Sequence, residues 1–177
     1  SVYGMSATIQ RGDRQDKKML MQLGPIRHRY TAKERAQKQG IGHYVYPRFT
    51  KLVDLNPSEG KNPSDYYRLI MQSELRNMQV VSDTIDCVKR GRTPVIMTKY
   101  KEHAQKLYDM LQGSADHVFL LQGGKSLKER SAIREQMAAV RADESIILVA
   151  IGQYVGEGFN YPRLDTMLLA MPISLEG

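Results

Sequence analysis

The stretch PVIMTKYKEHAQKLYDMLQGSADHVFLL, from Pro94 to Leu121, decides the fold class. It opens with PVIMT, a short apolar run typical of a buried strand, and closes with a second such run, HVFLL, at His117–Leu121. Between the two runs, apolar residues recur at helical spacing, and Gly113 then supplies a helix stop. Two apolar strands joined by one amphipathic helix favour a parallel pair, because parallel strands need a crossover connection. The helical stripe consists of Ala104, Leu107, Tyr108 and Leu111.

The same alternation continues on both sides of this stretch. Upstream, a helical stripe precedes a stop at Gly91, and downstream Ser126 and Glu129 form a capping box that starts another helix. Two more apolar strands are expected at Ser145–Ala150 and Leu164–Met171. The pattern predicts an α/β fold in which right-handed βαβ units build a parallel sheet flanked by helices. The stripes are Met78, Val81, Ile85 and Val88 in the upstream helix and Ile133, Met137 and Val140 in the downstream helix.

The chain before Tyr66 is less regular. Residues 1–30 begin with an apolar stretch and then turn polar, and residues 31–65 are basic and loop-like. Within the second zone, residues 40–53 alternate enough to form a strand, and residues 56–65 have the composition of a loop. We therefore expect a boundary near residue 30 and regular structure from Tyr66 onward.

Composition narrows the class of protein. The 177 residues are 41% hydrophobic and 25% charged, which supports a sizeable core and argues against global disorder. The net charge of +7 favours a polyanionic partner. The alternative is that the excess positive charge only keeps the protein soluble. The single cysteine, Cys87, fits a reducing compartment and is expected to be a packed thiol. Because no apolar run approaches the ~20 residues of a membrane span and no signal peptide opens the chain, we expect a cytoplasmic protein without a membrane partner.

Polar residues and glycines gather where the parallel strands should end. Binding sites in such sheets form at the carboxyl ends of the strands. Asp143 and Glu144, by contrast, precede their strand, and no apolar strand ends in a carboxylate that could hold Mg²⁺. The four histidines show no metal-ligand spacing, and we expect His103 to be an exposed helix residue and His117 to start a strand. The carboxyl ends are residues 98–99, 122–125, 152–162 and 172–174.

The segment Gly124-Lys125-Ser126 looks like the end of a phosphate-binding P-loop between a strand and a helix. A complete P-loop needs a glycine where this chain has Phe119, and too few residues follow the strand to wrap a triphosphate. A single phosphate of a nucleic-acid backbone suits the amides of this helix start better, with Lys125, Lys128 and Arg130 nearby. The alternative is an ordinary turn that leads into a solvated basic helix.

Four segments carry a resemblance to the superfamily 2 helicases. GMSAT, at Gly4–Thr8, resembles motif III, and TPVIMTKYKEHAQKL resembles the motif IV region of the second RecA-like domain. VFLLQGGKSLKER resembles the strand, turn and helix that follow. ILVAIGQYVGEGFNYPRLDTMLLAMPIS resembles motif V and the strand that leads to motif VI. The amino-acid sequence of these motifs is most similar to that of bacterial DEAD/DEAH-type restriction-helicase-like proteins.

This resemblance implies part of an ATP-dependent nucleic-acid helicase or translocase, in which ATP sits between two RecA-like domains. Residues 1–30 would contain the end of the first domain and the start of a linker, and residues 31–177 would form the second domain up to motif VI. The P-loop of the first domain and motif VI would lie beyond the two ends of the chain. The implied partners of the intact protein are ATP, Mg²⁺, the first RecA-like domain and nucleic acid, DNA more than RNA. This chain alone is expected to bind no cofactor and to hydrolyse no ATP.

The resemblance also assigns roles to individual positions. Motif III, which comprises Ser6, Ala7 and Thr8, would couple the nucleotide state to the domain interface. The motif V loop would face ATP through Gly156, Glu157, Gly158 and Asn160. The nucleic-acid track would be lined by Thr98, Lys99, Gly123, Gly124, Lys125, Arg130, Gly152 and Gln153. Two positions depart from the family, because Asn160 stands where Asp is usual and Ile151 stands where Thr is common.

Two other interpretations stay open. A non-catalytic α/β module that binds nucleic acid fits the positive charge and the lack of a complete set of catalytic motifs in this chain. A doubly wound enzyme acting on a small nucleotide would need a G-x-G-x-x-G segment after its first strand, and the sequence contains none.

Overall fold

The computed structural model describes residues 16–28, 34, 38, 40, 42–50, 62–122, 127–152 and 159–172. The chain divides into two compact units, one of Ser1–Arg48 with Glu176–Gly177 and one of Phe49–Leu175. The described part of the first unit contains helix α1 (Asp16–Leu23). Gly24 ends this helix with a φ of 81°, a left-handed conformation that glycine adopts without steric cost. The predicted domain boundary near residue 30 stays a prediction.

The second unit contains a four-stranded parallel sheet with the strand order β2-β3-β1-β4. Every described strand pair is parallel, as the alternation of strands and helices predicts. The strands are β1 (Pro94–Thr98), β2 (His117–Leu121), β3 (Ile146–Ile151) and β4 (Thr166–Leu169). The helices are α3 (Pro63–Gln72), α4 (Glu74–Lys89), α5 (Lys101–Met110) and α6 (Leu127–Ala139).

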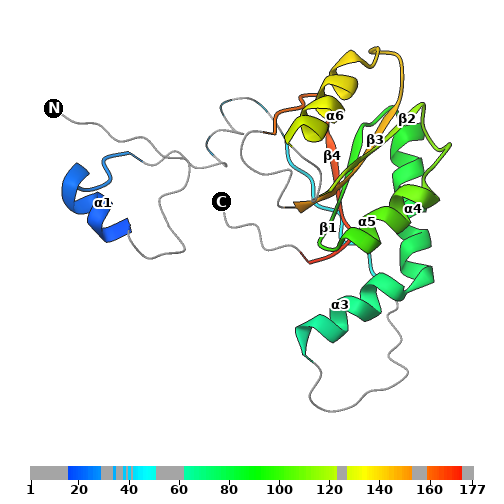
Figure 1. The fold of residues 1–177 in the computed structure, drawn as a ribbon, viewed down its shortest axis with the longest axis horizontal. Coiled ribbons are helices and arrows are strands. Elements are labelled where there is room, and N and C mark those ends of the chain that lie inside the picture. The colour runs from blue at the N-terminus through cyan, green and yellow to red at the C-terminus, as the bar shows by residue number, and fades with distance from the viewer. Residues whose placement is uncertain are drawn as a thin grey trace. The chain divides into compact units, whose positions relative to one another are not determined.

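Helices cover both faces of this sheet (Figure 1). Side chains alternate along β1, so Ile96 packs on the face that α4 and α5 cover, whereas Val95 and Met97 pack on the face that α6 covers. The central strand β3 is buried along its whole length, as expected for a parallel strand with helices on both sides. Gly91 and Gly113 have φ values of 72° and 76° and follow α4 and α5 as the predicted stops.

Three predictions about local structure are wrong. Residues 63–65 are not loop but the first turn of α3, because Pro63 suits the first helical position and the backbone N–H of Asn62 donates to the Asp65 carboxylate at 3.1 Å. Residues 42–50 form no strand, and the aromatic side chains there are largely exposed. Met78 is 59% exposed, although Val81, Ile85 and Val88 of the same predicted stripe pack against the core, and the fully buried residues of α4 are Asn77 and Thr84. The predicted capping box at Ser126 lies outside the described residues.

Candidate nucleic-acid interface

The carboxyl ends of the parallel strands form one edge of the sheet, which is hereafter called the carboxyl edge. Thr98 ends β1, Lys99 follows it, and Gly152 follows β3. Thr98 and Gly152 are buried, whereas Lys99 is exposed. Arg130 lies within α6. The other predicted positions lie outside the described residues, and they are Ser6, Ala7, Thr8, Gly123, Gly124, Lys125, Gln153, Gly156, Glu157 and Gly158.

A buried chain of hydrogen bonds starts at Thr98. The Thr98 hydroxyl lies 2.7 Å from Nδ1 of His103, and Nε2 of His103 lies 3.0 Å from Oδ1 of Asn77. The Asn77 amide nitrogen donates to the Met71 carbonyl at 2.9 Å. Because this donation leaves Oδ1 of Asn77 as the acceptor for the ring, His103 carries its proton on Nε2 and accepts at Nδ1 from Thr98. The chain of bonds thus connects β1, α5, α4 and α3.

His103 corrects a prediction, because its side chain is fully buried rather than exposed. It lies on the same helical stripe as Leu107 and Leu111, four and eight residues further along, so its spacing predicted burial although its polarity did not. Burial, and then the positive charges of Arg76 and Lys106, lower the pKa of His103 from 6.5 to about 4. The ring is therefore neutral at physiological pH, as the hydrogen bond that it accepts from Thr98 requires.

Two tyrosines surround Lys99 at the end of β1. The Lys99 ammonium lies 4.5 Å from the centroid of the Tyr67 ring, which comes from α3, and 5.9 Å from the centroid of the Tyr100 ring. The two rings are 6.2 Å apart and tilted by 58°. Both tyrosines are half-buried. These three residues are hereafter called the Tyr–Lys cluster.

Asn160 lies beside α6 rather than at the end of a strand. It is exposed and shares a groove with Phe159 and Arg134, whose guanidinium lies 5.6 Å from the centroid of the Phe159 ring. The hydroxyl of Tyr161 donates to the Met137 carbonyl at 2.8 Å and holds this segment against the helix. The predicted contact of Asn160 with ATP stays a prediction.

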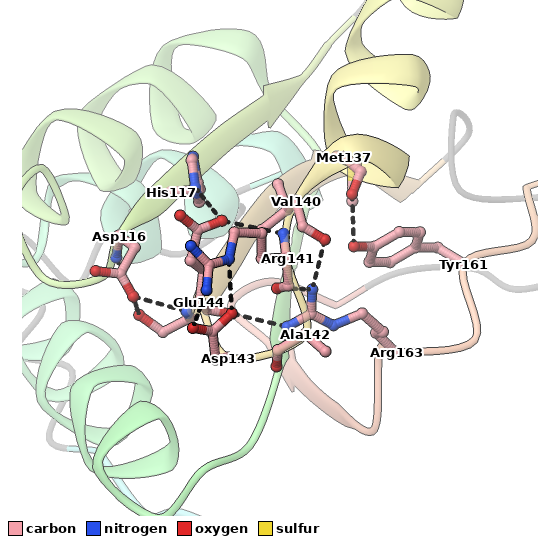
Figure 2. A network of polar contacts seen from close by, with 11 residues as sticks. Asp116, His117, Met137, Val140, Arg141, Ala142, Asp143, Glu144, Tyr161 and Arg163 are labelled. Atoms are coloured by element: carbon pink, nitrogen blue, oxygen red, sulfur yellow. Dashed lines mark hydrogen bonds and ion pairs between the residues drawn. The ribbon is translucent and has the colours of Figure 1, made fainter.

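The opposite edge of the sheet carries a polar network in which Arg163 is the main donor (Figure 2). Its guanidinium donates to carbonyls that follow α6, at 3.0 Å to Arg141 and 2.7 Å to Glu144. Asp143 and Glu144 precede β3, so they lie at the amino ends of the strands, as predicted. Within the described ranges, no three carboxylate, histidine or cysteine side chains gather to hold a metal ion.

Sequence reasoning missed the residues that support the end of β1. Asn77 and Tyr67 lie outside the motifs that the resemblance covers. Nothing in the sequence of their helices indicated that Asn77 contacts His103 or that Tyr67 contacts Lys99.

Cys87 is half-buried in α4, and burial raises the pKa of its thiol, in keeping with a packed cysteine. No helix in the described part of the chain is long and apolar enough to span a membrane.

The comparisons with known proteins support the fold. The structure is similar to the crystal structure of T4 UvsW, with a TM-score of 0.53 and 19% sequence identity. The similarity covers 65% of this chain and 23% of that one. The sequence matches no family model and no curated protein. The predicted fold class is confirmed, because helices cover both faces of a parallel sheet and T4 UvsW contains a similar fold.

Proposed function

We propose that this chain is part of an ATP-dependent nucleic-acid helicase or translocase and that its parallel sheet belongs to the second RecA-like domain. In this proposal the carboxyl edge holds the phosphates of a nucleic-acid strand. The motif V loop contributes one face of an ATP site whose P-loop and Mg²⁺ ligand belong to the first domain. Closing and opening of the two domains around ATP would then move the strand.

The exposed lysine at the carboxyl edge is the observation on which the proposal depends. Lys99 directly follows β1, at the edge where parallel α/β sheets bind their ligands. The net charge of +7 adds a general attraction for a polyanion. The structural similarity to T4 UvsW and the helicase-like motifs of the sequence support the assignment to a helicase domain.

Among the described residues at the carboxyl edge, one is placed to contact a phosphate and two are placed to support the edge. Lys99 is exposed and has the charge to contact a phosphate directly. Thr98 is fully buried and its hydroxyl is engaged by His103, so we assign it to holding the edge in shape rather than to touching the strand. Gly152 is buried as well and receives the same supporting role.

The experiment is a salt series measured by fluorescence anisotropy with labelled single strands of two unrelated sequences. We expect weak binding, with dissociation constants of ~10⁻⁴–10⁻⁶ M, and little dependence on sequence. The logarithm of the affinity should fall with the logarithm of the salt concentration by about 0.7–0.9 per phosphate contact. The double variant Lys125→Ala/Arg130→Ala should reduce this slope by about one to two contacts.

The matched control is Lys89→Ala/Arg90→Ala. These two cations are exposed at the end of α4, which leads into the amino end of β1, so they lie away from the carboxyl edge. The control should lose much less affinity than the Lys125/Arg130 variant. Equal losses in the two double variants would mean that surface charge in general holds the strand, and the proposed track would be wrong.

The second candidate function is a nucleic-acid-binding module without catalysis. The observation in its favour is that the 177 residues contain no complete P-loop. The two candidates differ in their dependence on nucleotide. If the chain belongs to a helicase, a protein that also carries a P-loop domain should hydrolyse ATP faster in the presence of nucleic acid, whereas a binding module should show no such stimulation.

A further inference from the structure

The buried hydrogen bonds place one face of α3 at the end of β1. The last acceptor in the chain of bonds is the carbonyl of Met71, which lies one helical turn after Tyr67 in α3. The first member, Thr98, directly precedes Lys99. The same bonds that join α3 to β1 therefore hold Tyr67 beside Lys99. All three side chains that form the bonds are fully buried, which makes this support rigid.

The cluster that results combines a positive charge with aromatic surface. Lys99 is exposed, and its ammonium lies over the Tyr67 and Tyr100 rings. Further exposed cations are adjacent in sequence, because Arg68 follows Tyr67 and Lys101 follows Tyr100. Proteins bind single-stranded nucleic acid with this combination, in which cations meet the phosphates and aromatic rings stack on the bases.

We propose that the Tyr–Lys cluster binds one nucleotide of a single strand, with Lys99 on the phosphate and Tyr67 and Tyr100 against an unpaired base. The inference rests on the proposed function and extends it, because it makes the site selective for unpaired nucleic acid. In a duplex the bases are stacked on one another and present no free face to the rings, so only the phosphate contact would remain.

The contact between Lys99 and Tyr67 in the free protein is compatible with this role. An attraction between an exposed cation and an aromatic ring is weak, and stacking of a base on the ring is the stronger of the two interactions. When a phosphate attracts the exposed ammonium, the flexible Lys99 side chain swings toward it and uncovers the ring. The rings need not move, because α3 and the start of α5 are already tied to β1 by the buried bonds.

The test compares two labelled strands of equal length in fluorescence anisotropy with the full chain at neutral pH. One strand is an oligodeoxythymidylate, and the other has the same phosphates but abasic sugars throughout. The unaltered protein should bind the thymidylate strand about tenfold more tightly than the abasic strand. The variant Tyr67→Leu should lose that preference and bind the abasic strand as well as before, whereas Tyr67→Phe should keep it.

Tyr66 supplies the matched control, because it is the adjacent residue of α3, is 49% exposed and takes no part in the cluster. Tyr66→Leu should keep the preference for the thymidylate strand. Equal binding of the two strands by the unaltered protein, which needs no variant to fold, would overturn the stacking site but leave the proposed function standing. An equal loss in Tyr66→Leu and Tyr67→Leu would also overturn it. If neither strand binds at all, the proposed function fails together with this inference.

Discussion

At the scale of single residues, the His103 imidazole shows how one buried polar group joins several elements. It accepts from Thr98 at 2.7 Å and donates to Asn77 at 3.0 Å, so it needs both of its nitrogens in the neutral form. Protonation would reverse the hydrogen bond with Thr98, whose hydroxyl would then have to accept, and would add a charge in the core near the positive charges of Arg76 and Lys106. The stability of the fold should therefore depend on the protonation state of this ring.

We predict that acid destabilises the protein through His103. The unfolded chain takes up a proton at His103 below pH 6.5, whereas the folded protein resists it until about pH 4. The unfolded state binds more protons in this window, so the free energy of unfolding should fall by about 3 kcal/mol as the pH drops through it, and the contribution should be constant above it. Urea unfolding followed by circular dichroism at several pH values measures this fall.

The comparison variant for this prediction is His103→Gln, which removes the titration but keeps an amide that can hydrogen-bond. Its free energy of unfolding should fall less than that of the unaltered protein over the same pH window. If His103→Gln and the unaltered protein lose stability in parallel, the ring is not held neutral in the core.

At the scale of elements, Arg163 determines how the end of α6 connects to β3. Arg163 donates to four carbonyls in the segment from Val140 to Glu144, which connects the end of α6 to β3 (Figure 2). Arg163 also precedes β4 by a few residues, so this one side chain joins the connection after α6 to the segment that enters the edge strand.

We predict that Arg163→Met lowers the free energy of unfolding by about 1.5–3 kcal/mol, because several charge-assisted hydrogen bonds are lost and partly buried carbonyls remain unpaired. Arg141→Met is the matched control. Arg141 pairs with Asp143 at 2.9 Å in the same network, but both side chains are well exposed, so this variant should cost less than about 1 kcal/mol. Urea unfolding of the two variants distinguishes them, and equal costs would mean that the Arg163 bonds contribute no more than a surface ion pair.

At the scale of the whole molecule, the parallel topology gathers residues from distant segments at one edge. The strands β1 and β3 are adjacent in the sheet although about fifty residues separate them in sequence, as the pairing of Val95 with Leu148 shows. Thr98 and Ile151 are paired at their carboxyl ends, which brings the motif IV and motif V segments of the resemblance to the same edge. This convergence is a property of the whole sheet and of no single element.

We predict that the purified 177-residue chain does not hydrolyse ATP, with or without single- or double-stranded nucleic acid. The physical reason is that no segment of the sequence can wrap the phosphates as a complete P-loop does. A phosphate-release assay measures the turnover, and strand binding by the same preparation shows that the chain is folded. Turnover that follows the chain through purification would contradict the proposal that this chain contributes only one face of the ATP site.

The sequence by itself determined which segments form the strands and helices and that the strands run parallel, whereas the strand order β2-β3-β1-β4 came from the structure. Apolar runs such as PVIMT and the spacing of Leu107 and Leu111 carry that information locally, because a buried strand or helix face needs apolar side chains at a set period. The glycine stops at Gly91 and Gly113 are equally local, since a positive φ is a property of the residue itself. The parallel pairing followed from the length of the connections between strands.

Only the tertiary structure decided which polar residues are buried and which side chains meet. His103 was expected to be exposed and is buried, whereas Met78 was expected to be buried and is exposed. Burial depends on what packs against a helix face as well as on the polarity of the residue. A buried imidazole is tolerated here because Thr98 and Asn77 satisfy both of its nitrogens. The encounter of Tyr67 with Lys99 likewise depends on the packing of α3 against β1, which no local pattern in either segment encodes.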